Sequence, residues 1–376
     1  MTNLILVFLC LLPFSALIIN KVDIWHGQGY YAQGAVLIIY CYHLFKKCRP
    51  LSVLFGWVGL FTLFQFVCVQ IQTQQYAVKL FLPFFNFICI VILFDVLTTY
   101  CNKDFYTRFI KYFSVSFLIV LAYCLIQKLG LDQFYRIIGR SQEVNNNQVV
   151  GIIGNPMHNA HFIAICLPIL FILKGWVRKL AIFFALLMIT FTGTSTGLIT
   201  SVIVLIFAQV FLKIFSKKEI ILYSIIGISL VILKYPFFLT KIHQFFQPDY
   251  NFEKVGRWMR WKDYYPIFLQ KPITGWGLGF INEMAKTPQF LNWRHVHFEY
   301  YHFAIETGLI GVGLAFWGII DYFRRFKSVA KDETTVIMAS MFLAFLLTSF
   351  SGYPMHLWVT SVLGITSYSF MYIRSK

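Results

Sequence analysis

The sequence predicts an all-α fold, a polytopic transmembrane helix bundle of about 12 spans with one larger loop subdomain outside the membrane. Of the 376 residues, 59% are apolar and 12% are charged, whereas a soluble domain carries about a quarter charged residues. Apolar stretches recur along nearly the whole chain, and Lys and Arg residues gather in short clusters between them. We therefore expect a single integral membrane domain over 1–376 rather than a series of separately folded domains.

The expected spans follow from the length of these apolar stretches. A helix needs about 20 mostly apolar residues to cross the hydrocarbon region of a bilayer. We expect the first segment to be a spanning helix rather than a cleaved signal, because it lacks a basic leader and a cleavage site of small residues. The expected spans are 2–19, 31–45, 51–69, 79–99, 112–128, 159–173, 179–193, 196–213, 219–234, 301–322, 335–351 and 357–373.

Basic residues mark every second connection between these segments. Eighteen of the 32 Lys and Arg residues lie in alternate connections and at the C-terminus, whereas the short connections between them hold only Lys21 and Lys79. Basic residues accumulate in cytoplasmic loops, so the pattern predicts that the clustered side and both termini are cytoplasmic. Because the clusters are a topology signal, we expect no nucleic-acid partner. The clusters are Lys46, Lys47 and Arg49; Lys103, Arg108 and Lys111; Lys174, Arg178 and Lys179; Lys213, Lys217 and Lys218; Arg324, Arg325, Lys327 and Lys331; and Arg374 and Lys376.

Two longer connections, 128–158 and 234–300, fall on the opposite, outer side. They hold the remaining 12 basic residues, nine of them in 234–300. Long outer segments cross the membrane largely regardless of their charge, so these residues do not weaken the predicted orientation. Only 234–300 is long enough to form a subdomain outside the membrane, and functional residues are expected there.

Within that loop, the segment 256–268 alternates cations with aromatic residues. One interpretation is an amphipathic helix at the membrane interface, anchored by its aromatic and long basic side chains. The functional interpretation is that Arg257 holds a lipid-linked phosphate, because a guanidinium binds phosphate oxygens bidentately. The next run, 272–280, has glycines at every second position, which permit a tight turn and the close approach of a ligand to the backbone.

Three histidines, His295, His297 and His302, follow this run. Their spacing matches no closed zinc pattern and no thiolate lies near, so we expect no metal. A neutral imidazole at the entry of a helix that faces an aqueous cavity is a suitable general base. Gly308 and Gly311 in the helix that follows predict close helix packing.

These stretches resemble the signature of the bacterial O-antigen ligase and O-antigen polymerase family, polytopic transferases that use sugars carried on undecaprenyl diphosphate. The family pattern is an Arg, a Trp four residues later, a Pro eleven residues after that, a Gly-x-Gly-x-Gly turn, and a His eleven residues before a Gly. A third family-like stretch is 154–159, directly before an expected span. The chain meets every spacing with Arg257, Trp261, Pro272, Gly275, Gly277, Gly279, His297 and Gly308.

The resemblance implies a multi-pass glycosyltransferase of the bacterial inner membrane, with 128–158 and 234–300 as periplasmic loops. It would move a glycan from undecaprenyl diphosphate to a hydroxyl of a glycan or of the lipid A core, with membrane lipids as its other partners. Arg257 would stabilise the charge of the leaving diphosphate and His297 would take the acceptor proton. No metal and no cofactor would be needed, because the donor is already activated. The substrate-binding residues would be Arg294, Arg260, Trp261, Gly275, Gly277, Gly279 and Glu306.

Some assignments stay open within this resemblance. Phe298 stands where the family usually has Asn, Ser or Gln, and Thr196 stands where it often has a second Arg. Glu306 would orient His297 or cap its helix. The residues that would replace the second Arg as a phosphate clamp are Arg294, which is preferred, Arg140, Arg136 and Arg260.

The function also has alternatives. Thr196 favours a polymerase of O-antigen or capsule repeats over an O-antigen ligase, which would transfer to the lipid A core. The alternative from another functional class, the transporters, is a lipid-linked oligosaccharide flippase. Transporters commonly place ionisable groups near the bilayer midplane. In this chain, five such groups gather instead near the outer ends of the expected spans: His158, His161, His297, Glu306 and His356.

Overall fold

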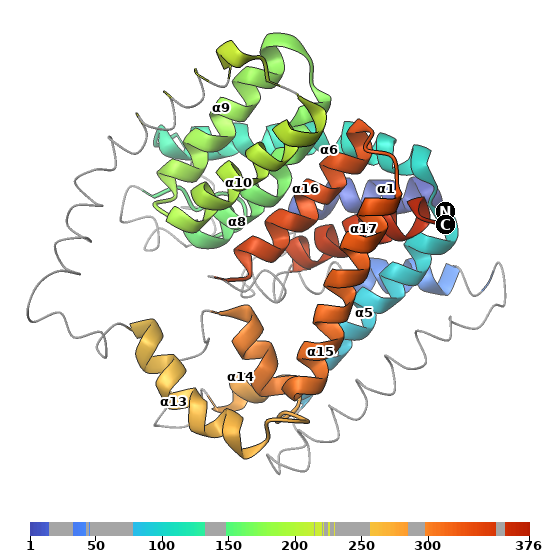
Figure 1. The fold of residues 1–376 in the computed structure, drawn as a ribbon, viewed down its shortest axis with the longest axis vertical. Helices are drawn as coiled ribbons and strands as arrows, with labels where there is room; N and C mark the ends of the chain where they lie inside the picture. Colours follow the sequence, from blue (N-terminus) through green and yellow to red (C-terminus); the bar gives the residue numbers. More distant parts are fainter. Residues whose placement is uncertain are drawn as a thin grey trace, which may run out of the picture.

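A computed structural model gives the structure of most of the chain (Figure 1). The residues it describes are 1–14, 33–42, 45, 78–131, 148–213, 215–219, 221, 225, 229, 256–284, 298–350 and 358–376, without the side chains of 78–84, 256–260, 282, 283 and 358. Over these ranges the chain is helical and contains no strand, as predicted. The helices are α1 (Thr2–Leu11), α5 (Val78–Tyr100), α6 (Lys103–Lys128), α8 (Pro156–Cys166), α9 (Gly175–Phe191), α10 (Ser195–Leu212), α13 (Gly256–Gln270), α14 (Phe280–Met284), α15 (Glu299–Ser328), α16 (Glu333–Thr348) and α17 (Trp358–Arg374), with 3-10 turns Leu12–Phe14 and Leu167–Ile172.

Three of these helices, α6, α10 and α15, are long and apolar enough to cross a membrane. Shorter apolar helices correspond to several other expected spans. The expected span 51–69 lies outside the described residues, as does nearly all of 219–234. The count of twelve spans therefore stays a prediction. The shorter apolar helices are Thr2–Phe14, Gln33–Tyr42, Phe85–Tyr100, Pro156–Ile172 and Glu333–Thr348.

The start of α6 differs most from the expected boundary. The apolar run predicts a span from residue 112, but the helix begins at Lys103. The side chain of Asn102 caps it, because Oδ1 accepts a hydrogen bond from Phe105 N at 3.0 Å. Asp104 in the first turn adds a favourable interaction with the helix dipole. Hydropathy missed these turns because they are charged.

The helices differ in how they are buried. Most side chains of α8 and α16 are buried, so these two helices form the centre of the bundle. In contrast, α10 and α15 expose large apolar side chains, among them Ile199, Ile206, Leu314 and Trp317. An exposed apolar face on a long helix is what contact with lipid requires.

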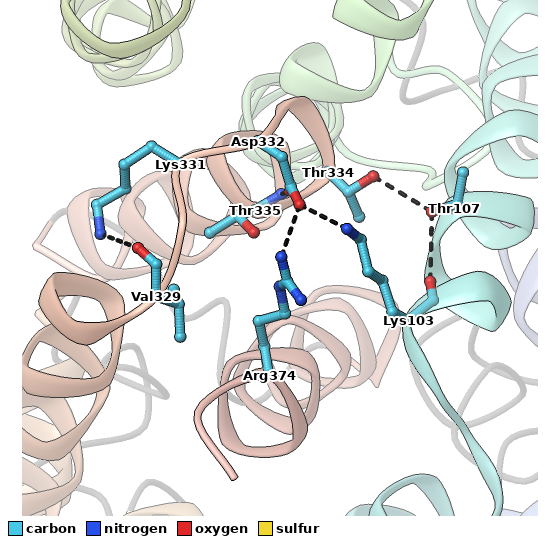
Figure 2. Close-up of polar contacts among 8 residues, drawn as sticks. All are labelled: Lys103, Thr107, Val329, Lys331, Asp332, Thr334, Thr335 and Arg374. Carbon is cyan, nitrogen blue, oxygen red and sulfur yellow. Dashed lines mark hydrogen bonds and ion pairs between the residues drawn. The ribbon is translucent and has the colours of Figure 1, made fainter.

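One end of the bundle is joined through Asp332, as Figure 2 shows. Its carboxylate caps α16 by accepting from Thr335 N at 2.9 Å. The same carboxylate lies 2.8 Å from Lys103 Nζ at the start of α6 and 3.0 Å from Arg374 at the end of α17. Burial raises the pKa of Asp332, but the hydrogen bonds from Lys103 and Thr335 outweigh burial and lower the pKa from 3.8 to about 2. Asp332 thus ties three helices together as a carboxylate.

The two chain ends lie at this same end of the bundle (Figure 1). Arg108 in α6 donates to the side chain of Asn3 at 3.5 Å, and Arg325 donates to Ser375 Oγ at 2.7 Å. Several clusters that the charge pattern predicts as cytoplasmic therefore meet at one place.

Candidate functional site

The loop expected to hold the function contains α13 and α14, which pack against α15 at the edge of the bundle (Figure 1). A small apolar cluster, separate from the main core, joins the three helices. Trp276, in the segment between α13 and α14, donates from Nε1 to the carbonyl oxygen of Ile267 at 2.7 Å and stacks on Phe280. The buried members of the cluster are Tyr264, Ile267, Phe280, Ile281 and Ile305.

Helix α15 is broken at Gly308, whose φ of 67° and ψ of −171° lie outside the helical region. Only glycine adopts this conformation at little cost. The break frees carbonyl groups in the turn before it. Residues 271–279, the glycine turn, supply donors to them: Trp276 N donates to the carbonyl of Ile305 at 3.0 Å, and Gly277 N donates to that of Glu306 at 2.7 Å.

The glycine turn also binds the amides that follow the break. Leu309 N donates to the carbonyl of Pro272 at 2.8 Å, and Ile310 N donates to that of Ile273 at 3.2 Å. Four backbone hydrogen bonds therefore join the turn to α15. We call this set the backbone joint. Broken helices are tolerated at membrane depth only where other backbone or side-chain groups satisfy the freed polar atoms, and the joint does so.

Gly275 and Gly308 are in contact at the joint. A Cβ on Gly275 would lie 2.4 Å from the carbonyl oxygen of Glu306, and one on Gly308 would lie 2.2 Å from that of Ile273. Both glycines also have positive φ, 70° at Gly275 and 67° at Gly308. The close packing predicted at Gly308 is thus a contact with the glycine turn. At Gly275, the space that the sequence predicted for a ligand is occupied by the backbone of α15.

A buried pair of polar side chains lies next to the joint. His302 and Glu306 are only 1% and 2% exposed, and His302 Nε2 lies 3.2 Å from Glu306 Oε1. The same carboxylate oxygen accepts a hydrogen bond from Ile281 N, at the start of α14, at 3.3 Å. Glu306 therefore contacts His302 and α14. Sequence analysis gave His302 no role, although a His and a Glu four residues apart on a helix are expected to contact each other.

The start of α15 is held from two sides. Glu299 N donates to the carbonyl of Ser349 at 3.1 Å, which ties α15 to the end of α16. The ring of Phe298 lies 5.7 Å from that of Trp261 in α13 and 6.0 Å from that of Phe350, on which it stacks. Tyr301 donates to the carbonyl of Trp261 at 3.3 Å. The residue after His297 is therefore packed between α13 and α16.

The predicted site residues fall into three groups. Trp261, Gly275, Gly277, Gly279 and Glu306 belong to the unit formed by α13, the glycine turn and α15. The backbone of Arg257 and Arg260 lies in α13, and their side chains are outside the described residues. Arg294 and His297 lie outside the described residues altogether, as do the alternatives Arg136 and Arg140.

Two further stretches noted in the sequence begin helices. Asn155 caps α8, because Oδ1 accepts from Met157 N at 2.9 Å, and Pro156 occupies the first helical turn. Thr196 lies in the first turn of α10, where the next residue, Gly197, packs against α8. A Cβ on Gly197 would lie 2.9 Å from the Cβ of Ala160. The two helix starts are thereby held close together.

Part of the chain matches a known protein family. Residues 180–316 match the O-antigen ligase family model. The resemblance inferred from the motifs is thereby confirmed, and it supports glycan transfer of the O-antigen ligase or polymerase type in a membrane protein. The matched segment runs from α9 to the part of α15 beyond Gly308, so it includes the whole backbone joint. No curated protein and no solved structure matches the chain.

Proposed function

We propose that the chain transfers a glycan from undecaprenyl diphosphate to an acceptor hydroxyl at the periplasmic face of the bacterial inner membrane, as a polymerase of O-antigen or capsule repeats. The observation that carries the proposal is the contact of Phe298 with Trp261 inside the matched segment 180–316. Arg257 precedes Trp261 by four residues in α13, about one helical turn. His297 directly precedes Phe298 in the sequence. The two candidate catalytic residues therefore belong to segments that meet.

The proposed reaction is a displacement at the anomeric carbon of the donor glycan. The bond from the acceptor oxygen to the anomeric carbon forms, and the bond from that carbon to the diphosphate oxygen breaks. His297 takes the proton of the acceptor hydroxyl. Arg257 stabilises the negative charge that develops on the leaving diphosphate, and a bidentate guanidinium suits its oxygens. Because the leaving group is already activated, the scheme uses neither metal nor nucleotide.

The proposed topology places this chemistry on one side of the membrane. It comprises about 12 spans, periplasmic loops at 128–158 and 234–300, and cytoplasmic termini. The meeting of both chain ends with Lys103, Asp332 and Arg374 at one end of the bundle supports it.

Alanine variants of Arg257 and His297 test the proposal. Each is expected to lower glycan transfer by about 100-fold or more, the loss seen when an electrostatic stabiliser or a general base is removed. Expression and membrane insertion should not change. Arg108→Ala is the matched control, because this basic residue lies far from the loop, in α6, and bonds to Asn3. Full activity of both variants in a strain lacking the native protein would overturn the proposal.

The second candidate is an O-antigen ligase, favoured by the description of the matching family. Lipopolysaccharide from a deletion strain separates the two on one gel. Loss of a polymerase leaves the core with a single repeat, whereas loss of a ligase leaves the bare core. Loss of a flippase would instead leave lipid-linked repeats on the cytoplasmic side, and that result would contradict both transferases.

A further inference from the structure

Two ionisable side chains, His302 and Glu306, are buried beside the backbone joint, where the reaction scheme gives them no role. They are 1% and 2% exposed and lie 3.2 Å apart on one face of α15. Burying a carboxylate costs free energy unless it is paired or hydrogen-bonded. The pair is therefore retained against a cost, next to the apolar residues Ile281 and Ile305. Such a pair can specify one arrangement of its neighbours.

The side chains of the pair join the first part of α15 to α14. His302 Nε2 lies 3.2 Å from Glu306 Oε1, and that carboxylate oxygen accepts from Ile281 N at 3.3 Å. The backbone of the same two residues makes separate bonds: His302 N donates to the carbonyl of Phe298 at 3.0 Å, and the carbonyl of Glu306 accepts from Gly277 N at 2.7 Å. The side-chain contacts therefore tie α15 to α14, which directly follows the glycine turn.

We propose that His302 and Glu306 are positioning residues, which act as one unit to hold the start of α15 against α14. This inference rests on the proposed function, because it concerns where His297 sits when it accepts a proton. Both side chains are buried, whereas a group that touches a glycan must be accessible to it. Glu306 is therefore assigned a positioning role in place of the substrate-binding role that the family resemblance implies.

Positioning at this place has a large effect on rate. A general base must lie within hydrogen-bond reach of the proton it removes. A displacement of about 1 Å at a reacting group can cost about 100-fold in rate. Because Phe298 lies against Trp261 directly before α15, loosening the contact of the pair with α14 lets the start of α15 shift relative to α13.

The test separates the length of the Glu306 side chain from its charge. Glu306→Gln keeps the length and an oxygen that accepts from Ile281 N, whereas Glu306→Asp keeps the charge and is shorter by one methylene. Purified protein is assayed with an undecaprenyl-diphosphate-linked repeat unit at a temperature where all variants remain folded. Ser340→Ala in α16 is the control, because it truncates a fully buried polar side chain away from this site.

Positioning predicts a specific order of activities. Glu306→Asp and His302→Ala should each lower kcat by about tenfold or more and change KM for the donor by less than about threefold, because neither residue touches substrate. Glu306→Gln should retain most of the kcat. The double variant His302→Ala/Glu306→Asp should be no slower than the slower single variant, because the two act as a unit. Ser340→Ala should match the wild type.

Other results would overturn the inference. A rise in KM at unchanged kcat would make Glu306 a substrate contact, and Asp more active than Gln would show that its charge acts directly. If the two single losses of kcat multiply in the double variant, His302 and Glu306 act independently and not as one unit. Wild-type activity in every variant would remove the role altogether. If Arg257→Ala and His297→Ala are fully active, the proposed function fails; if those two are inactive while the His302 and Glu306 variants are normal, only the positioning role fails.

Discussion

Replacing Gly308 with alanine places a Cβ inside the backbone joint. On the observed backbone, that atom lies 2.2 Å from the carbonyl oxygen of Ile273 and 2.5 Å from Gly275 N, whereas Cβ atoms essentially never approach other heavy atoms within 3.0 Å. Both neighbours are backbone atoms, so no side-chain rotation relieves the clash. The glycine turn must move away from α15.

Three contributions set the magnitude. An alanine in this glycine conformation costs about 1–3 kcal/mol in backbone strain. Displacing closely packed atoms to admit an extra methyl group costs about 1–3 kcal/mol more. The hydrogen bonds from Leu309 N and Ile310 N lie directly beyond the substitution, and weakening either costs about 1 kcal/mol. We expect Gly308→Ala to lower the free energy of unfolding by about 3–7 kcal/mol.

Thermal unfolding of the purified protein in detergent measures the effect. Gly313→Ala is the matched control, because Gly313 lies in the same helix and a Cβ added there would meet no atom within 4 Å. Alanine there should be neutral or stabilise the helix by up to about 1 kcal/mol. Gly308→Ala should unfold at least about 5 °C below this control. Equal unfolding temperatures would refute the joint as a structural element.

Two further predictions concern capping residues. Asp332→Asn should destabilise the protein by about 1 kcal/mol at pH 7, because the lowered pKa corresponds to about 2 kcal/mol before the screening expected for a carboxylate about one-third exposed. The carboxylate is favoured in the folded state, so this stabilisation is complete above about pH 4 and is lost as the pH falls toward the folded pKa of about 2. Unfolding curves at pH 7 and pH 3 check it, and an Asn variant as stable as the wild type at pH 7 would contradict it. Asn155→Ala should cost about 1 kcal/mol through loss of the cap on α8, whereas Asn155→Asp should not; equal unfolding temperatures for the two variants would argue against the cap.

The sequence predicted helices better than it predicted the contacts between them. Apolar runs locate α5, α9, α10, α16 and α17 to within a few residues, because burial in lipid and in the core both select apolar side chains. The same criterion missed the charged first turns of α6, where a side-chain cap rather than hydropathy starts the helix.

In the site too, the sequence predicted local features but not long-range contacts. The spacing of the glycines predicts a tight turn, but it does not show that Gly275 contacts Gly308. That contact depends on how the turn folds back onto α15, a long-range pairing without a local signal. The His302–Glu306 pair does have a local signal, its helical spacing. The interaction of Glu306 with Ile281 depends on the position of α14 and has none.

The backbone joint also bears on how this surface can vary. Its four hydrogen bonds use only main-chain atoms, so substitutions in the glycine turn and in residues 305–310 remove none of these bonds, except where a Cβ is forbidden. Proteins built on the same joint can therefore change the side chains around it while the two segments keep their alignment. Under this constraint, the surface around the joint can change by point substitution, with Gly275 and Gly308 as the positions that must stay the same.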